Sequence, residues 1–229
     1  MKIQNKFSIE LHKRDISLIL EIQEYFGGIG SISQSKTRNT VNFTVSGIKD
    51  LTNIIIPHFL KYKLISKKAA DFMCFTKIVE LMSNNAHLKT EGLHKIINIK
   101  ASMNLGLSDV LKSEFINITP VDRPIILTKI IPEPNWLTGF VSGEGCFLIK
   151  ISKSNSHKIG YQVWLEFSIK QHERDKKLMW LISKYLGCGK IYKDSRPRSP
   201  VCYFRIIKFK DIQNKLIPFF EKYPLIGVK

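Results

Sequence analysis

The sequence predicts an α+β fold made of two pseudo-symmetric halves, each with an antiparallel sheet that buries only one face. Three observations support this prediction. Two blocks of sequence occur twice in the same order, a proline-rich stretch separates the copies, and apolar and polar residues alternate before the helical patterns. A repeat of this kind lets two halves of one chain mimic a symmetric dimer about a pseudo-two-fold axis.

The repeat consists of two blocks. FSIELHKRDISLILEIQEYFGG, from Phe7, returns as FSIKQHERDKKLMWLISKYLGC, from Phe167. KDLTNIIIPHFLKYKLISKK, at 49–68, returns as KDIQNKLIPFFEKYPLIGVK, at 210–229. Two similar blocks in one order are not a chance event, so both halves are expected to share a fold. We assign residues 1–114 to the first repeat and residues 135–229 to the second.

Residues 115–134 are predicted to form the linker between the repeats. This stretch includes Pro120, Pro124, Pro132 and Pro134. Proline lacks a backbone N–H and has a fixed φ, so this density disfavours the interior of helices and sheets.

The elements of the second half follow from periodicity. Alternation from Tyr161 to Lys170 predicts an antiparallel strand with one apolar and one polar face. Apolar residues from Leu178 to Tyr185 then recur at helical spacing, and Gly187 is expected to end that helix. Strands are predicted at 190–192 and 201–207, with a helix at 211–220. In the first half, helical patterns follow the second block at 72–82 and 93–97.

The composition limits the partners. The chain of 229 residues has 36 Lys and Arg against 19 Asp and Glu, a formal net charge of +17, which favours a polyanion such as nucleic acid. No apolar run approaches the roughly 18 residues of a membrane span, and the first residues lack a secretory signal. The cysteines form no CxxC pair and are expected to be buried reduced thiols. They are Cys74, Cys146, Cys188 and Cys202.

The start of the second half carries the most specific motif, LTGFVSGEG at 137–145. Gly139 and Gly143 lie four residues apart, which leaves one helix face nearly bare for close approach of a second helix. Leu137, Phe140 and Val141 are expected in the core. Glu144 falls at the helix end, where its carboxylate and a nearby backbone carbonyl suit a divalent cation.

This segment resembles the nine-residue motif that names the LAGLIDADG homing endonucleases. The resemblance implies that two such helices pack at the pseudo-dyad and that four-stranded, saddle-shaped sheets lie in the DNA major groove. It implies Mg²⁺-dependent phosphodiester hydrolysis, by a monomer, of a long, nearly asymmetric double-stranded target. Glu144 matches the catalytic metal ligand, beside the Gly143 carbonyl. Gln171 matches a residue that positions water, and Lys229 and Lys68 match a basic residue near the active site.

The resemblance also implies that polar side chains on the strands and their loops contact bases and phosphates. The predicted contacts are Lys150, Ser152, Lys153, Ser154, Gln162, Trp164, Glu166, Ser168, Lys170, Lys193, Arg196, Arg198 and Arg205. Trp164 has a second interpretation, as the cover of a small satellite core.

The sequence departs from the family pattern in three ways. Ser142 replaces the usual Asp at the sixth motif position, and the first half has Leu11 where the second has Gln171, so the two sites are expected to be unequal. Six residues precede Phe7, whereas the motif lies about 30 residues before Phe167. By this comparison the first repeat lacks its motif helix and first strand, and the second lacks its C-terminal helices. The chain is then incomplete at both ends, with one catalytic carboxylate.

Other signals have structural interpretations. His12 and His172 recur at strand–helix junctions, which suits a turn-stabilising histidine better than a His-based nuclease. Gly27, Gly28 and Gly30 resemble a phosphate loop, but no Lys-Ser/Thr follows, and Gly27 returns as Gly187, so a helix end is the better interpretation.

The sequence is therefore consistent with three functions. The leading one is a site-specific DNA endonuclease, and the sequence leaves open whether this chain as given is active or inactive. The alternatives are an RNA-binding group I intron maturase and a decayed, non-catalytic DNA-binding relic. The family is common in organellar introns, and the chain is rich in Ile, Lys and Asn, so a mitochondrial origin is expected.

Overall fold

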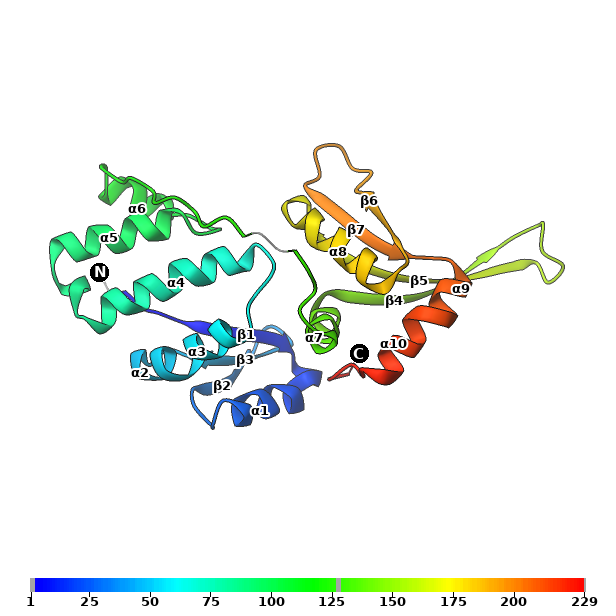
Figure 1. Cartoon of the computed structure of the whole chain (residues 1–229), viewed down its shortest axis with the longest axis horizontal. Coiled ribbons are helices and arrows are strands. Elements are labelled where there is room, and N and C mark those ends of the chain that lie inside the picture. Colours follow the sequence, from blue (N-terminus) through cyan, green and yellow to red (C-terminus); the bar gives the residue numbers. More distant parts are fainter. Residues whose placement is uncertain (1–2, 127–128, 229) are drawn as a thin grey trace. The chain divides into compact units, whose positions relative to one another are not determined.

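The computed structural model describes residues 3–126 and 129–228 and divides the chain into two compact units (Figure 1). Unit 1 is Met1–Ile126 and unit 2 is Leu127–Lys229. Each unit combines helices with an open antiparallel sheet, which confirms the predicted fold class. No helix in the described residues is both long enough and apolar enough to span a membrane.

Unit 1 has a three-stranded sheet in the order β1-β3-β2. The chain folds in the order β1 (Phe7–His12), η1 (Lys13–Asp15), α1 (Ile16–Tyr25), β2 (Ser31–Gln34), β3 (Thr40–Val45), α2 (Ile48–Asp50), η2 (Leu51–Ile55), α3 (Ile56–Lys61), α4 (Lys68–Ser83), η3 (Ala86–Leu88), α5 (Thr90–Ala101) and α6 (Asp109–Glu114).

Unit 2 has a four-stranded sheet in the order β4-β5-β7-β6. Its elements are α7 (Pro134–Glu144), β4 (Gly145–Lys153), β5 (Tyr161–His172), η4 (Glu173–Asp175), α8 (Lys176–Leu186), β6 (Lys190–Lys193), β7 (Val201–Ile206), α9 (Phe209–Asp211), η5 (Ile212–Leu216) and α10 (Ile217–Lys222). Within the described residues, unit 1 has no counterpart of α7 and β4.

One local feature recurs in both units. The helix formed by α2, η2 and α3 has a π-helical turn at Leu51–Ile55, and the helix formed by α9, η5 and α10 has one at Ile212–Leu216. Pro57 and Pro218 follow these turns at the start of the next helical segment. Because proline cannot donate the usual helical hydrogen bond, the widened turn is placed where that bond is missing.

Each sheet buries one face against helices. In unit 1, Val41 and Phe43 of β3 are fully buried with Ile19 of α1. In unit 2, Phe204 of β7 is fully buried, as is Met179 of α8. The residues between the buried ones point to the opposite face, because side chains alternate along a strand. That second face is the polar one in both units.

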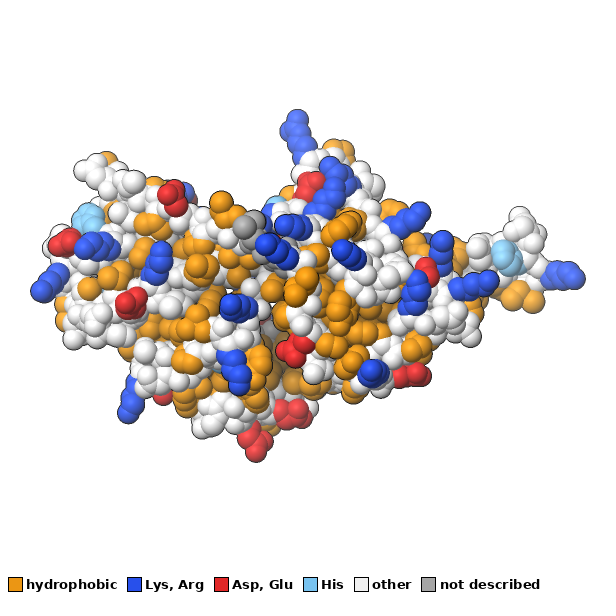
Figure 2. Space-filling view, in the orientation of Figure 1, with side chains coloured by type: hydrophobic (Ala, Val, Ile, Leu, Met, Phe, Trp, Pro, Cys, Tyr) orange, Lys and Arg blue, Asp and Glu red, His pale blue; other side chains and the backbone are white. Residues whose placement is uncertain are grey.

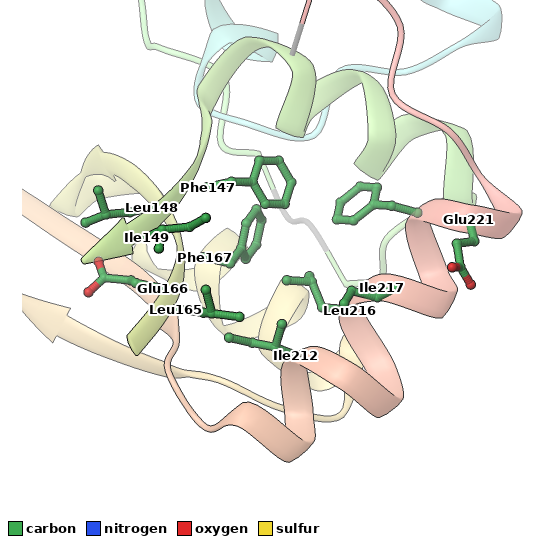
Figure 3. Close-up of a pocket in the computed structure, with 11 residues that line it drawn as sticks. Phe147, Leu148, Ile149, Leu165, Glu166, Phe167, Ile212, Leu216, Ile217 and Glu221 are labelled. Atoms are coloured by element: carbon green, nitrogen blue, oxygen red, sulfur yellow. The ribbon is translucent and has the colours of Figure 1, made fainter. Parts of the chain in front are cut away.

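Unit 2 also contains an apolar groove of about 480 Å³ between its sheet and the last helix (Figure 3). Its lining includes Phe147, Phe167 and Leu216. The equivalent surface of unit 1 is covered, because Phe72 of α4 packs on Phe59 with ring centroids 5.6 Å apart. Ile217 at the groove is therefore 47% exposed, whereas its equivalent, Ile56, is 7% exposed.

Two expectations need correction. Residues 115–126, predicted as linker, pack on unit 1: Arg123 donates to the Ser102 carbonyl (2.9 Å) and pairs with Asp71 (3.0 Å). Pro134, also assigned to the linker, begins α7, a position where its missing N–H costs little. Among the cysteines, Cys146 is exposed rather than buried, because it lies on the outward face of β4.

Candidate nucleic-acid interface and catalytic carboxylate

The motif helix α7 buries one side and leaves the other bare. Leu137 and Val141 are fully buried, as expected. A Cβ added to Gly139 or Gly143 would meet no atom within 4 Å, so this side has room for a close helix neighbour. Phe140 is only half-buried, contrary to expectation. It stacks on Trp136 at 5.0 Å, because residues four apart are neighbours on a helix surface.

Polar side chains within α7 bond to backbone carbonyls. The Thr138 hydroxyl lies 3.3 Å from both the Pro134 and Tyr223 carbonyl oxygens, which ties the helix to the last segment of unit 2. Ser142, at the sixth motif position, donates to the Thr138 carbonyl (3.0 Å). This hydroxyl is therefore bonded within the helix itself.

Glu144 is the last residue of α7 and is exposed. The next residue, Gly145, begins β4 and pairs with Ile169 of β5. Gln171 follows Ile169 by two residues, about 7 Å along the strand, so Glu144 and Gln171 lie at the same end of the sheet. Gln171 itself is half-buried and lies on the core side of β5, opposite Cys202.

The donor set near Glu144 suits a hard cation. Its carboxylate and the Gly143 carbonyl offer oxygen atoms, the ligands that Mg²⁺ takes while keeping several waters. No group of three or more His, Cys, Asp and Glu side chains within the described ranges could hold a metal by itself. A cation here would need water and phosphate oxygens to complete its coordination. Lys68 is an exposed residue at the start of α4, and Lys229 lies outside the described residues.

The β-sheet register of unit 2 brings most of the predicted contact residues onto one face. Lys150 lies opposite Trp164, and Lys170 lies opposite Tyr203. The predicted residues on this outward face are Lys150, Ser152, Gln162, Trp164, Glu166, Ser168, Lys170 and Arg205.

Specific interactions organise this outward face. The Lys150 ammonium lies 4.9 Å from the Trp164 ring centre, so Trp164 packs with a surface cation outside the buried cores. The Arg205 guanidinium lies 4.7 Å from the Tyr203 ring centre and 5.7 Å from that of Tyr192. Its Nε is also 3.3 Å from a Glu166 carboxylate oxygen.

Other predicted contact residues lie elsewhere. Lys153 is opposite Tyr161 and Lys193 is opposite buried Cys202, so alternation places both lysines on the side of the apolar face. Lys193 pairs with Glu173 at 3.1 Å. Ser154 lies in the turn after β4, where its hydroxyl is 2.9 Å from His157 Nδ1.

Arg196 and Arg198 lie in the loop between β6 and β7. Arg196 binds both carboxylate oxygens of Asp194, and Ser199 donates to the same carboxylate (2.8 Å). These hydrogen bonds, with that of Arg196 the strongest, hold the pKa of Asp194 well below its usual range. Arg198 adopts a positive φ of 57° and turns the loop back.

The polar faces include residues beyond the predicted contacts. Lys190, Tyr192 and Tyr203 share the outward face of unit 2 with Arg205. The outward face of unit 1 was not assigned at all, although the alternation in TVNFTV at 40–45 marks it. Extending the period-two pattern to each strand would have identified Ser8, Glu10, Ser31, Ser33, Asn42 and Thr44.

The recurring histidines and glycines have structural roles. His12 Nδ1 accepts from Arg14 N (3.3 Å), and His172 Nδ1 accepts from Arg174 N (3.1 Å), so each caps a short 3-10 turn. Gly27 and Gly187 follow helices α1 and α8 with positive φ, which identifies them as helix ends.

The surface of unit 2 carries dense positive charge. Figure 2 shows Lys and Arg side chains around β6, β7 and the β4–β5 hairpin. Among the described residues, Lys150, Lys170 and Lys190 form no ion pair within 4.0 Å. An exposed, unneutralised cation is available to a phosphate.

The profile of one protein family, described as "LAGLIDADG endonuclease", matches residues 1–79 and 137–229, one segment in each repeat. The chain belongs to the LAGLIDADG endonuclease family. The first matched segment begins ahead of β1, and the second begins within α7, with Glu144 at its eighth position.

Two relatives are similar over the whole chain. "Probable intron-encoded endonuclease 3" of Neurospora crassa is 48% identical over 229 residues, which cover all of this chain and 42% of that protein. "Probable intron-encoded endonuclease 2" of the same fungus is 43% identical over 239 residues, covering 99% of this chain and 50% of that protein. The chain thus spans about half the length of these two relatives.

Solved LAGLIDADG structures share the fold. I-SmaMI bound to uncleaved DNA in the presence of calcium is 45% identical, with a TM-score of 0.96 over 100% of this chain and 76% of that chain. I-LtrWI bound to target DNA is 41% identical, with a TM-score of 0.93 over 98% of this chain and 74% of that chain. The predicted LAGLIDADG fold is confirmed.

Proposed function

We propose that the protein is a site-specific, Mg²⁺-dependent endonuclease that binds double-stranded DNA with the polar faces of its two sheets. The position of Glu144 carries this proposal. It is the last residue of a helix with a bare two-glycine side, and the strand that follows presents Lys150 outward. A carboxylate is thereby joined directly to a candidate DNA-binding face.

The binding step follows from charge and shape. Cationic side chains that neutralise phosphates release counterions, so a protein with a formal charge of +17 should bind DNA in a salt-dependent manner. Base edges in the major groove are accessible to side chains carried by strands. The DNA-bound states of I-SmaMI and I-LtrWI support duplex DNA as the partner.

The proposed hydrolytic step uses five residues. Glu144 and the Gly143 carbonyl would hold Mg²⁺, which when bound makes a water more acidic and stabilises the leaving 3′ oxygen. Gln171 is proposed to orient the attacking water by a hydrogen bond. Lys68 and Lys229 are proposed to stabilise negative charge on the phosphate. Structures of I-SmaMI in which one or two lysines are replaced by alanine make lysine a reasonable position to probe.

We further propose that the gene lies in a mitochondrial intron and that the protein acts as a monomer. Relatives are named intron-encoded endonucleases. A Podospora anserina protein named for ND4 intron 1 is 34% identical over 99 residues, 42% of this chain. One chain carries two copies of the repeat, as a symmetric dimer would, which supports the proposal that a second chain is not required.

The decisive experiment compares Glu144→Gln with the parent chain. Binding to a randomised duplex library would select a target, and strand cleavage of that target would then be measured with and without Mg²⁺. We expect Glu144→Gln to retain binding and to lose hydrolysis by about 100-fold or more. Glu133→Gln, at the opposite end of α7, is the matched control. Because the described residues supply one motif carboxylate, nicking of one strand is the expected product.

Two outcomes would overturn the proposal. Affinity that does not change between about 50 and 200 mM salt would exclude groove binding driven by phosphate contacts. Binding to structured intron RNA with no binding to the duplex library would favour the maturase function.

A further inference from the structure

The register of the two sheets defines equivalent cross-strand rows on their outward faces. The repeat aligns Ser8 with Ser168, and the strands that pair with these residues extend the first row across each sheet. The first row reads Ser8, Thr44 and Ser31 in unit 1, and Ser168, Arg205 and Lys190 in unit 2.

The second row lies two residues further along. It reads Glu10, Asn42 and Ser33 in unit 1, and Lys170, Tyr203 and Tyr192 in unit 2. At five of the six equivalent positions, a neutral or acidic side chain of unit 1 is replaced by a cationic or aromatic one in unit 2.

These rows are accessible in both units. The flanking residues Phe43 and Phe204 are fully buried, so the residues between them point outward. The side chains of Glu10 and Arg205 are 43% and 34% exposed. The difference between the units therefore concerns surfaces that a ligand can reach.

The formal charge differs as well. On the outward face of unit 2, four cations and one carboxylate leave three positive charges; the cations are Lys150, Lys170, Lys190 and Arg205, and the carboxylate is Glu166. On the strands of unit 1, Glu10 is the charged residue of the outward face, and Arg38 lies 3.8 Å from it in the adjoining loop.

Arg205 is held in one orientation. Glu166 and the rings of Tyr203 and Tyr192 contact its guanidinium, so little rotamer entropy remains to be lost on binding. A fixed guanidinium on a groove-facing strand suits the O6 and N7 acceptors of guanine. Asn42, in the corresponding face of unit 1, has the donor and acceptor that match adenine N7 and N6.

We infer that the two faces divide electrostatic attraction and base recognition unequally. The face of unit 2 supplies the salt-dependent attraction to duplex DNA and reads guanine through Arg205. The face of unit 1 reads its half-site with amide and hydroxyl groups, chiefly Asn42, and adds little to the salt dependence. This inference rests on the proposed binding of duplex DNA and assigns the chemistry of each half of the target.

The test measures affinity for a selected duplex against salt concentration, with the 229-residue chain. We expect a Lys170→Gln, Lys190→Gln double variant to reduce the slope of log affinity against log salt by about 2. The matched unit 1 variant, Glu10→Gln with Ser31→Ala, should leave the slope within about 0.5 of the parent value. Lys170→Arg with Lys190→Arg should retain the parent slope, and circular dichroism would verify that all variants are folded.

The base assignment is tested by repeating the selection with two variants. Arg205→Ala should weaken binding about 5- to 150-fold and remove a guanine preference at one position. Asn42→Ala should remove an adenine preference in the other half-site without changing the salt slope.

The outcomes separate this inference from the proposed function. A flat salt response of the parent chain refutes duplex binding itself. A steep parent response that the unit 2 variants leave unchanged, or that the unit 1 variants reduce equally, overturns the inference and leaves the proposed function standing. Loss of a guanine preference in both half-sites with Arg205→Ala would also overturn it.

Discussion

His58 of unit 1 and Phe219 of unit 2 occupy the same position of the repeat, and each ring lies between two tyrosine rings. The ring centroids lie 5.5 and 5.0 Å from those of Tyr25 and Tyr62 around His58, and 6.2 and 5.3 Å from those of Tyr185 and Tyr223 around Phe219. Unit 1 therefore places a titratable ring in an aromatic cluster that is fully uncharged in unit 2.

This cluster predicts a pH-dependent stability for unit 1. Burial, and secondarily the nearby Lys61 charge, lower the pKa of His58 below its ordinary value of 6.5. The unfolded state then binds more protons near pH 6, so stability is lost as the pH falls through 6.5 towards the folded-state pKa. We expect His58→Phe to reduce the drop in melting temperature between pH 7.5 and pH 5, measured by calorimetry. Phe219→His should increase that drop, and equal pH profiles for all three proteins would contradict this account.

Gly143 and Gly145, two positions apart, predict opposite responses to alanine. A Cβ at Gly143 meets open space, so Gly143→Ala should stabilise α7 by about 0.5–1 kcal/mol through reduced backbone entropy of the unfolded chain. A Cβ at Gly145 would lie 2.6 Å from Val141 Cγ1 and 2.8 Å from its carbonyl oxygen, so Gly145→Ala should destabilise unit 2 by about 1–3 kcal/mol. Urea unfolding followed by tryptophan fluorescence reports unit 2, since Trp136, Trp164 and Trp180 all lie there. Equal midpoints for the two variants would refute the difference.

The groove of unit 2 predicts unequal costs for the same substitution in the two repeats. Ile56→Ala removes a side chain that is packed against α4 and should cost about 2–5 kcal/mol. Ile217→Ala removes a half-exposed side chain and should cost less than about 1 kcal/mol. Hydrogen exchange of the amides in each unit measures both effects separately. A loss in unit 2 as large as that in unit 1 would show that Ile217 is covered in solution.

Cysteine reactivity should single out one thiol. Cys74, Cys188 and Cys202 are buried, which limits access of a reagent to their thiols. Burial also raises the pKa of each thiol and so lowers its thiolate fraction. Cys146 is exposed on the outward face of β4. Labelling of the folded chain with a thiol reagent should therefore give one fast equivalent, which Cys146→Ser abolishes. Bound duplex DNA should slow this labelling, because Cys146 shares the outward face with Lys150.

The sequence by itself determined the repeat, the one-sided strands, the helix ends and the motif helix with Glu144. These features depend on local physics. Alternation follows from strand geometry, helical spacing from the α-helix, and helix ends from glycine at positive φ, so each is written in neighbouring residues. The same local patterns marked Leu137 and Val141 as core residues, both of which are fully buried.

The tertiary structure alone decided which distant side chains share a surface. Lys153 and Lys193 do not lie on the outward face. Lys153 pairs with Tyr161 and Lys193 with Cys202, and this strand register determines the face of the sheet on which each lysine lies. The pairing of Arg205 with Glu166 joins strands that are remote in sequence, and the packing of residues 115–126 on unit 1 depends on Arg123 reaching Asp71. Periodicity specifies which residues can face a surface, whereas register and packing select the partners they meet there.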